Sequence, residues 1–319
     1  MRLSSKKAKR LVLAAVVFCV CLFASFGLVA CDDGNGSGYS SSSSVQGPPR
    51  DSTAVVLEVS QPGTRVVADD NAVLDYSNAA DGYVCALSYL EGIRVKVLVE
   101  VAGIRYQYTI DQPGVFITIP LSEDNGLYSV SVWRNVSGDS YSPIFNQDID
   151  VVLNDGMLPF LYPNQFVSFA AGDVATNLSQ QLATGSITEA DAINSIYRWV
   201  CNNVSYDMEK ANTVASGYLP NNTDTIETGM GICFDYAVLT TSMLRAQSIP
   251  AKLIIGYAGS AYHAWIEVYS AETGKVLHYN FTGDSWVRMD PTFDASTSGI
   301  GNLSSIIGDG EHYQDMYRY

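Results

Sequence analysis

Strand-forming segments dominate the chain from about residue 53 to residue 153. Short runs rich in Val, Ile, Tyr, Phe and Thr alternate with turn material such as Gln112-Pro113-Gly114. Leu127–Trp133 alternates apolar and polar residues, which is the pattern of a half-buried strand. The pattern predicts seven strands, at Thr53–Ser60, Tyr83–Leu90, Ile93–Val101, Ile104–Ile110, Val115–Leu121, Leu127–Val136 and Ile144–Leu153. Short strands with regular turns are typical of a two-sheet β-sandwich.

The pattern changes to helix and then strand after about residue 156. Thr188-Glu189-Ala190-Asp191 is a capping box, and it predicts a helix through about Asn203. A polar loop is expected from Ala211 to Gly231, and a second helix from near Cys233 to about Gln247. Strands are then predicted at Ala251–Tyr257, His263–Tyr269, Lys275–Phe281 and Trp286–Met289. The fold class expected for the whole chain is α+β: an Ig-like sandwich over residues 51–155, followed by helices packed on an antiparallel sheet over residues 156–319.

The first 30 residues have the pattern of a secretory signal peptide. Five basic residues precede an uncharged run from Leu11 to Ala30. A run of that length is also long enough to form a membrane-spanning helix. The end of the run favours export, because Leu28-Val29-Ala30-Cys31 resembles a bacterial lipobox. The resemblance implies cleavage before Cys31, a lipid on its sulfur and a location on the outer face of the cell membrane. Residues 31–50, rich in Gly and Ser, are then a flexible tether.

The charge of the chain argues against nucleic acid as a partner. The sequence has 18 Lys and Arg against 33 Asp and Glu, a net charge of −15. Without residues 1–30, 13 basic residues face 33 acidic ones. Nucleic acid is bound mainly through Lys and Arg, and anionic lipid headgroups repel an acidic surface. We therefore expect membrane association through the lipid anchor alone.

The cysteine count leaves at least one free thiol whose presence in an exported protein needs an explanation. Six cysteines are present, but two lie in the signal segment and Cys31 would carry lipid. Cys85 lies in an apolar strand and Cys201 on a helix, where both are expected to pack in the core. Three isolated cysteines make no disulfide framework in an exported protein. Cys233 is the remaining thiol.

Three short motifs combine residue types that nucleophilic catalysis needs. Cys233 follows Gly231 on the first turn of a predicted helix, where the partially positive helix end favours a thiolate and free N–H groups can meet an oxyanion. His263 begins an alternating strand, and Asp290 precedes Pro291 at the end of another. Taken singly, each has an ordinary structural role: a core cysteine, a surface histidine and a turn aspartate. His278 and His312 lie in no comparable motif.

The order of these motifs resembles the transglutaminase-like superfamily. The matching residues are Gly231-x-Cys233-x-Asp235-Tyr236, His263-Ala264-Trp265 and Asp290-Pro291-Thr292. The resemblance implies a papain-like fold over roughly residues 160–300. It implies that Cys233 is the nucleophile, His263 the general acid and base, and Asp290 the residue that orients the histidine. It also places Tyr206 near the site as a candidate oxyanion donor, although packing against a helix would explain this tyrosine equally well.

The chemistry that fits these residues is acyl transfer through a thioester. Water as acceptor makes a peptidase or amidase, which we favour; an amine as acceptor makes a transglutaminase. The alternatives are a non-catalytic surface module that binds peptide or glycan, and a scaffold in which the three residues only pack. The scattered acidic residues lack the spacing of a Ca²⁺ loop, so no metal or cofactor is expected. The expected partner is a peptide or protein substrate, with cell-wall peptides among the candidates; the oligomeric state stays open.

Overall fold

The computed structural model describes residues 47–297 and 311–319. The predicted signal segment, the lipobox with Cys31 and most of the tether lie outside the described residues. Within the described ranges, helices and antiparallel sheets combine in an α+β fold, as predicted. None of the described helices is long and apolar enough to cross a membrane.

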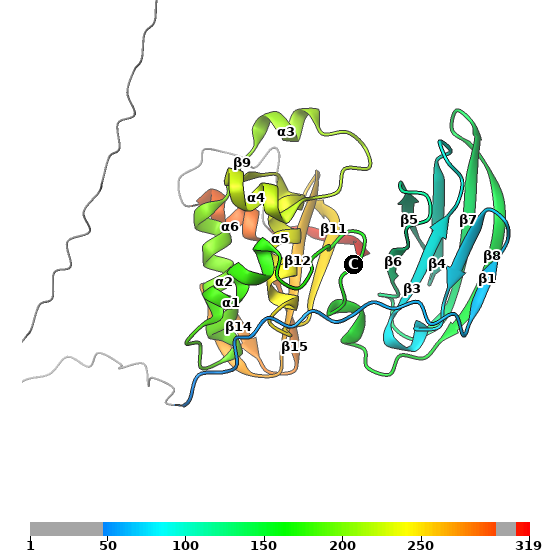
Figure 1. Cartoon of the computed structure of the whole chain (residues 1–319). Helices are drawn as coiled ribbons and strands as arrows, with labels where there is room; N and C mark the ends of the chain where they lie inside the picture. The colour runs from blue at the N-terminus through cyan, green and yellow to red at the C-terminus, as the bar shows by residue number, and fades with distance from the viewer. Residues whose placement is uncertain (1–46, 298–310) are drawn as a thin grey trace, which may run out of the picture. The chain divides into compact units, whose positions relative to one another are not determined.

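The N-terminal region consists of two four-stranded antiparallel sheets (Figure 1). One has the order β1-β2-β3-β6 and the other the order β5-β4-β7-β8. Their strands are β1 (Val66–Ala68), β2 (Ala72–Asp75), β3 (Tyr83–Ser88), β4 (Val95–Val101), β5 (Ile104–Ile110), β6 (Ile117–Pro120), β7 (Gly126–Ser137) and β8 (Ser140–Val151). Burial alternates along β4 and β5, so each of these strands turns one face to the core. Six of the seven predicted strands are confirmed, while β1 and β2 were not predicted.

The strand predicted at Thr53–Ser60 is wrong. Residues 51–60 are extended but pair with no strand. Their neighbours explain why: the backbone N–H groups of Arg50 and Val55 donate to the carbonyls of Ser186 and Ala246. We call residues 50–55 the strap, because they run along the C-terminal region (Figure 1). Within the predicted strand, the N–H groups of Ala54, Val55 and Ser60 bond to the side chain of Gln180, the carbonyl of Ala246 and the hydroxyl of Tyr83 instead of a neighbouring strand.

The C-terminal region packs helices on a second antiparallel sheet of order β15-β12-β11-β16. Its helices are α1 (Val174–Ala183), α2 (Glu189–Asn203), α3 (Met208–Thr213), α4 (Asn222–Thr228), α5 (Cys233–Arg245) and α6 (Pro291–Thr297). Its strands are β9 (Ser205–Tyr206), β10 (Met230–Gly231), β11 (Ala251–Ala258), β12 (Ala261–Ser270), β13 (Thr273–Val276), β14 (Tyr279–Thr282), β15 (Ser285–Met289) and β16 (Tyr313–Arg318). Two 3₁₀ turns lie at Ala79–Asp81 and Leu158–Phe160.

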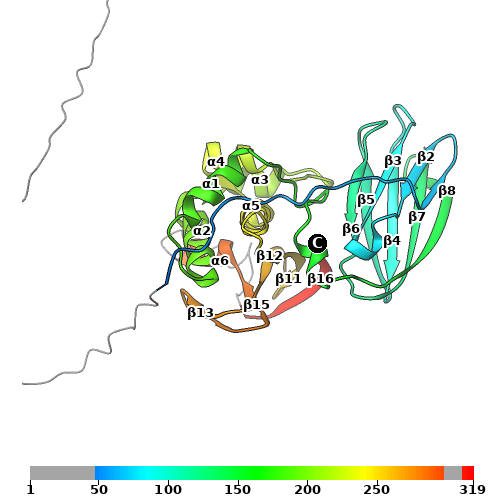
Figure 2. The same cartoon turned by 60° about the horizontal axis from the view of Figure 1, so that its bottom comes forward.

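Helix α5 is the centre of this region. It contacts α1 and α2 on one side and β11 and β12 on the other (Figure 2). Every residue from Asp235 to Arg245 is buried. Such a helix cannot move without disturbing both layers, so its first turn is a rigid support for a side chain.

Three further predictions from sequence meet different outcomes here. The capping box before α2 is present: Thr188 accepts from the N–H of Asp191, whose carboxylate accepts from the N–H of Thr188. The single strand predicted at Lys275–Phe281 is wrong, because it folds into the hairpin β13–β14. Leu277 makes that turn with a φ of 51°. Apolar residues rarely adopt a positive φ, so the sequence does not indicate a turn at this position. The predicted polar loop also contains α4, capped by Asn221, and β10.

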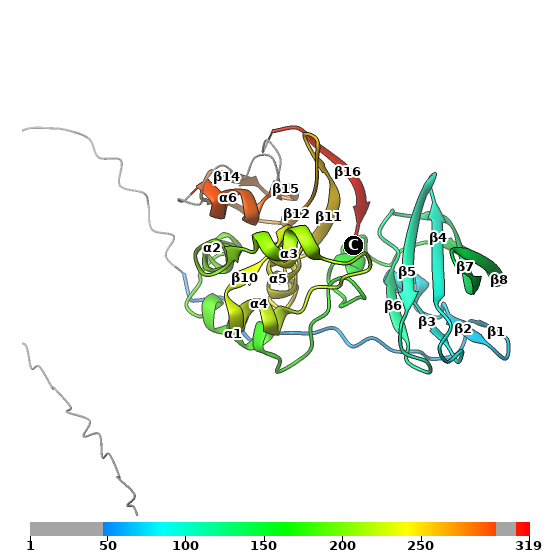
Figure 3. The same cartoon turned by 90° about the horizontal axis from the view of Figure 1, so that it is seen from above.

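Strand β16 completes the sheet from the end of the chain. It pairs with β11 from Ile254 to Ala258 and lies at the edge of the sheet (Figure 3). The described residues 47–297 and 311–319 belong to one compact unit, and β16 contacts β5 within it, because the N–H of Arg318 donates to the hydroxyl of Tyr106. Ser122 donates to the carbonyl of Arg318, whose guanidinium pairs with Glu123 at 3.2 Å.

Candidate active site

Cys233 lies at the first position of α5. The preceding residues form β10, which pairs in parallel with β9 so that Gly231 lies beside Tyr206. Gly231 is needed at this junction because a Cβ there would lie 2.7 Å from the Cβ of Asp235. Among the described residues, the backbone N–H of Cys233 has no hydrogen-bond acceptor. The thiol is partly exposed and stands beside a free donor, as the sequence predicted.

His263 and Asp290 form a buried pair. Nε2 of His263 lies 2.8 Å from Oδ2 of Asp290, and the two residues are only 1% and 3% exposed. Burial lowers the pKa of His263, but the charge and hydrogen bond of Asp290, together with Cys233, outweigh it and raise the pKa to about 10. Nδ1 of His263 is buried and lacks a hydrogen-bond partner in the described part of the chain. Nδ1 is therefore the nitrogen left for the thiol.

Asp290 also begins α6. Its Oδ1 accepts from the N–H groups of Thr292 and Phe293, which is the bonding of a helix N-cap. The two roles that the sequence suggested for this residue, turn aspartate and partner of a histidine, are thus both correct: one oxygen serves each. Capping holds the carboxylate in the one rotamer that faces His263.

Sequence reasoning missed Tyr313. From β16, its hydroxyl donates to Oδ2 of Asp290 at 2.7 Å, and its ring packs edge-on against Trp265 with centroids 4.8 Å apart. Burial and then Asp290 raise the pKa of Tyr313, so the hydroxyl keeps its proton. No local motif marks this residue, because its position depends on strand pairing with distant β11.

Cys233, His263 and Tyr206 line one cavity of about 760 Å³. Burial, followed by the charge of Cys233, raises the pKa of Tyr206, which leaves its phenol a hydrogen-bond donor. The other walls mix aromatic, small apolar and polar residues, and the aromatic ones include Phe166, Tyr218, Tyr262 and Tyr319. The structure brings together all four site residues proposed from the C-terminal sequence. A cavity of this size suits several residues of a polymer or one small molecule.

Comparison with known proteins decides the family of this region. Residues 176–291, which contain all four of those residues, match the family model of the transglutaminase-like superfamily. The chain contains a transglutaminase-like domain. Over 105 residues it is 29% identical to a protein-glutamine gamma-glutamyltransferase of Pseudomonas aeruginosa, covering 28% of this chain and 14% of that protein. Over 97 residues it is 33% identical to the UPF0252 protein MJ1282 of Methanocaldococcus jannaschii, covering 27% of this chain and 28% of that protein.

The chain thus spans less than a third of the length of either relative. Among solved structures, it is similar to the periplasmic domain of TgpA from Pseudomonas aeruginosa. That match has 14% identity and a TM-score of 0.36, and it covers 76% of this chain and all of that one.

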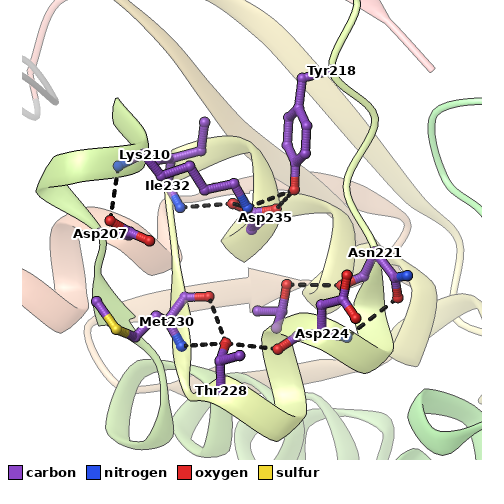
Figure 4. A network of polar contacts seen from close by, with 10 residues as sticks. Asp207, Lys210, Tyr218, Asn221, Asp224, Thr228, Met230, Ile232 and Asp235 are labelled. Atoms are coloured by element: carbon purple, nitrogen blue, oxygen red, sulfur yellow. Dashed lines mark hydrogen bonds and ion pairs between the residues drawn. The ribbon is translucent and has the colours of Figure 1, made fainter. Parts of the chain in front are cut away.

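An ion pair between partly buried Lys210 and fully buried Asp235 fixes the start of α5 in the transglutaminase-like domain (Figure 4). The carboxylate of Asp235, fully buried, accepts from Lys210 at 2.8 Å, from Tyr218 at 2.5 Å and from the N–H of Ile232 at 2.8 Å. Lys210 lies on α3, and Tyr218 lies in the segment that walls the cavity. Asp235 thereby ties the cavity wall to the helix turn that carries Cys233. Its role is positional.

The competing histidine and cysteines lie away from the cavity. His278 is exposed, 3.9 Å from Asp294, and does not line the cavity. Cys201 packs against the carbonyl of Pro291, and burial, followed by Asp294, raises the pKa of its thiol. Cys85 is buried in β3. Within residues 47–297 and 311–319, no three His, Cys, Asp or Glu side chains gather as a metal site requires.

Proposed function

We propose that the transglutaminase-like domain is a cysteine-dependent amide hydrolase that acts through Cys233, His263 and Asp290. The observation that carries this proposal is the 2.8 Å pair of His263 and Asp290, whose imidazole opens on the cavity that Cys233 lines. One ring nitrogen is held by the carboxylate and the other is unpartnered among the described residues. That arrangement suits a proton carrier between a thiol and a substrate.

The reaction begins when the Cys233 sulfur, whose proton His263 already holds, attacks a carboxamide carbon. The resulting oxyanion is met by the backbone N–H of Cys233 and the phenol of Tyr206. The C–N bond then breaks as His263 returns the proton to the leaving nitrogen. Water attacks the thioester with His263 as its base, the C–S bond breaks, and a carboxylic acid and the free thiol are released. Asp290 stabilises the imidazolium at each stage.

Transamidation is the second candidate. It uses the same residues, with a primary amine in place of water in the last step. The similarity to the P. aeruginosa glutamyltransferase favours it. The aromatic residues of the cavity wall would accept the apolar chain of an amine as readily as a peptide side chain.

A direct test measures release of ammonia or amine from peptide amides, with and without an added primary amine. We expect Cys233→Ala to abolish turnover and Cys201→Ala to retain it, because only Cys233 lines the cavity. Product that contains the added amine would select transamidation. Retained activity in Cys233→Ala would overturn both candidates.

We also propose that the protein is exported and anchored by a lipid on Cys31, which makes envelope proteins and cell-wall peptides its candidate substrates. The support is the lipobox-like segment Leu28–Cys31. The mature protein should then begin at a modified Cys31, and Cys31→Ser should release it from membranes. An N-terminal peptide that begins elsewhere in the wild type would refute the anchor.

A further inference from the structure

The N-terminal sheets supply part of the cavity wall. Arg105, Gln107 and Thr109 of β5 line the same cavity as Cys233 and His263. These three side chains share the outer face of β5, while Tyr106 and Tyr108 between them are buried. A strand of the N-terminal region therefore borders the proposed nucleophile.

Strand β5 is the edge of its sheet, and it pairs only with β4. In an antiparallel ladder the backbone groups of alternate residues point to opposite sides. Thr109 shows which set points outward, because its N–H and C=O bond to the side chain of Gln165 instead of β4. By this alternation the backbone groups of Gln107 and Arg105 also point outward. Within the part of the chain that the structure describes, those groups have no hydrogen-bond partner.

The contact of Gln165 has the form of a strand pairing. Its side-chain amide accepts from the N–H of Thr109 at 3.3 Å and donates to the C=O of Thr109 at 2.6 Å. One residue of an added antiparallel strand makes the same two bonds through its own N–H and C=O. Gln165 also lines the cavity, so an amide already occupies the first pairing position beside the site. The next two positions along β5 are open.

We propose that an extended segment of the acyl-donor polypeptide adds to the edge of β5 as a fifth strand and so reaches Cys233. The inference rests on the proposed function and names its substrate as an unfolded polypeptide segment. Apart from His263, the only charged residues that line the cavity are Arg105 and Asp111, and Arg105 is bonded to Glu100 at 2.6 Å. A segment of uncharged residues therefore suits the site. Main-chain hydrogen bonds supply affinity with little dependence on sequence.

The test removes one outward donor from β5. Gln107→Pro deletes the N–H that would pair with the substrate and leaves the ladder to β4 intact, because proline is tolerated on a strand edge. The probes are an acetylated peptide amide of about ten uncharged residues with one glutamine, and a blocked glutamine dipeptide too short to reach β5. We expect KM for the longer peptide to rise about ten-fold, and KM for the dipeptide to be unchanged.

Two matched controls separate this effect from altered side chains or general strain. Gln107→Ala keeps the backbone N–H and removes only the side chain, so the rise in KM from Gln107→Ala to Gln107→Pro measures the contribution of the N–H itself. Asn146→Pro changes an outward residue on β8, the opposite edge of the same sheet, and should leave both KM values unchanged. If Gln107→Pro fails to fold, methylation of alternate amide nitrogens in the longer peptide tests the same bonds, and only one of the two alternating sets should weaken binding.

Docking without turnover is tested with Cys233→Ala. Its binding of the labelled longer peptide is measured by fluorescence anisotropy. Loss of binding on adding Gln107→Pro supports the strand pairing even if no hydrolysis is detected. Turnover of both peptides with no effect of Gln107→Pro overturns the docking and leaves the proposed function standing. A change of oligomeric mass in Gln107→Pro, with KM unaltered, would mean that the edge pairs with a second copy and would also overturn it.

Discussion

Tyr313 and His263 converge on one oxygen of Asp290. The tyrosine hydroxyl donates to Oδ2 at 2.7 Å, and the imidazole nitrogen lies 2.8 Å from the same atom. The carboxylate is thus held between a strand from the end of the chain and the strand that carries the histidine. The proposed triad has a fourth member that orients its third.

Tyr313→Phe should reduce kcat several-fold with little change in KM, because Asp290 loses one of its two restraints at Oδ2 and His263 is less well oriented. A hydrogen bond to a charged group contributes about 1.5–3 kcal/mol, so urea unfolding should show a loss of that order. Tyr257→Phe, at an exposed tyrosine of β11, is the control and should change neither quantity. Equal kcat in Tyr313→Phe and wild type would limit Tyr313 to packing.

Two substitutions at Asp290 should separate its roles. Asn caps a helix about as well as Asp, so Asp290→Asn should keep α6 while kcat falls on the order of 10³-fold. Asp290→Ala should lose activity to a similar extent and also about 1 kcal/mol of stability, because the N–H groups of Thr292 and Phe293 lose their acceptor. Kinetics and chemical denaturation measure the two effects. If Asp290→Asn remains fully active, the carboxylate charge is not needed.

The pH dependence of stability should report His263. Its pKa is raised from 6.5 to about 10 in the folded chain, so the folded state holds a proton that the unfolded state releases. The stabilisation is complete below about pH 6.5 and is lost as the pH rises toward 10. The free energy of unfolding should therefore fall across that window, and His263→Gln should flatten the slope. His278→Gln, at an exposed site, should leave the slope as it is; a slope unchanged in His263→Gln would contradict the raised pKa.

Gly231→Ala should damage the site through sterics. The added Cβ would lie 2.7 Å from the Cβ of Asp235. A Cβ is bonded directly to the backbone, so a change of rotamer cannot relieve the clash. Overpacking of this kind costs about 1–3 kcal/mol, and the displacement falls on the turn that carries Cys233. We expect a lower melting temperature together with lower kcat. Gly156→Ala, where the Cβ meets nothing within 4 Å, is the matched control and should be neutral.

Local chemistry explains what the sequence could predict. The capping box at Thr188, the glycine before Cys233 and the proline after Asp290 each act within a few residues, and all three lie where they were expected. Tyr313 could not be found in that way, because its role depends on β16 pairing with β11 from a distance of more than fifty residues. The strap was mispredicted for a related reason: a β-forming segment can bond its backbone to a loop, a helix C-cap or a side chain instead of a sheet.

The strap has a mechanical consequence. Residues 50–55 are bonded to Ser186, Ala246 and the side chain of Gln180 before the chain enters the N-terminal sheets. The chain therefore leaves the C-terminal region, forms the two sheets and returns, so the sheets are in effect an insertion. A force applied at residue 47 would be carried by the residues around α1 and α5, and the sheets that border the cavity would bear little of it.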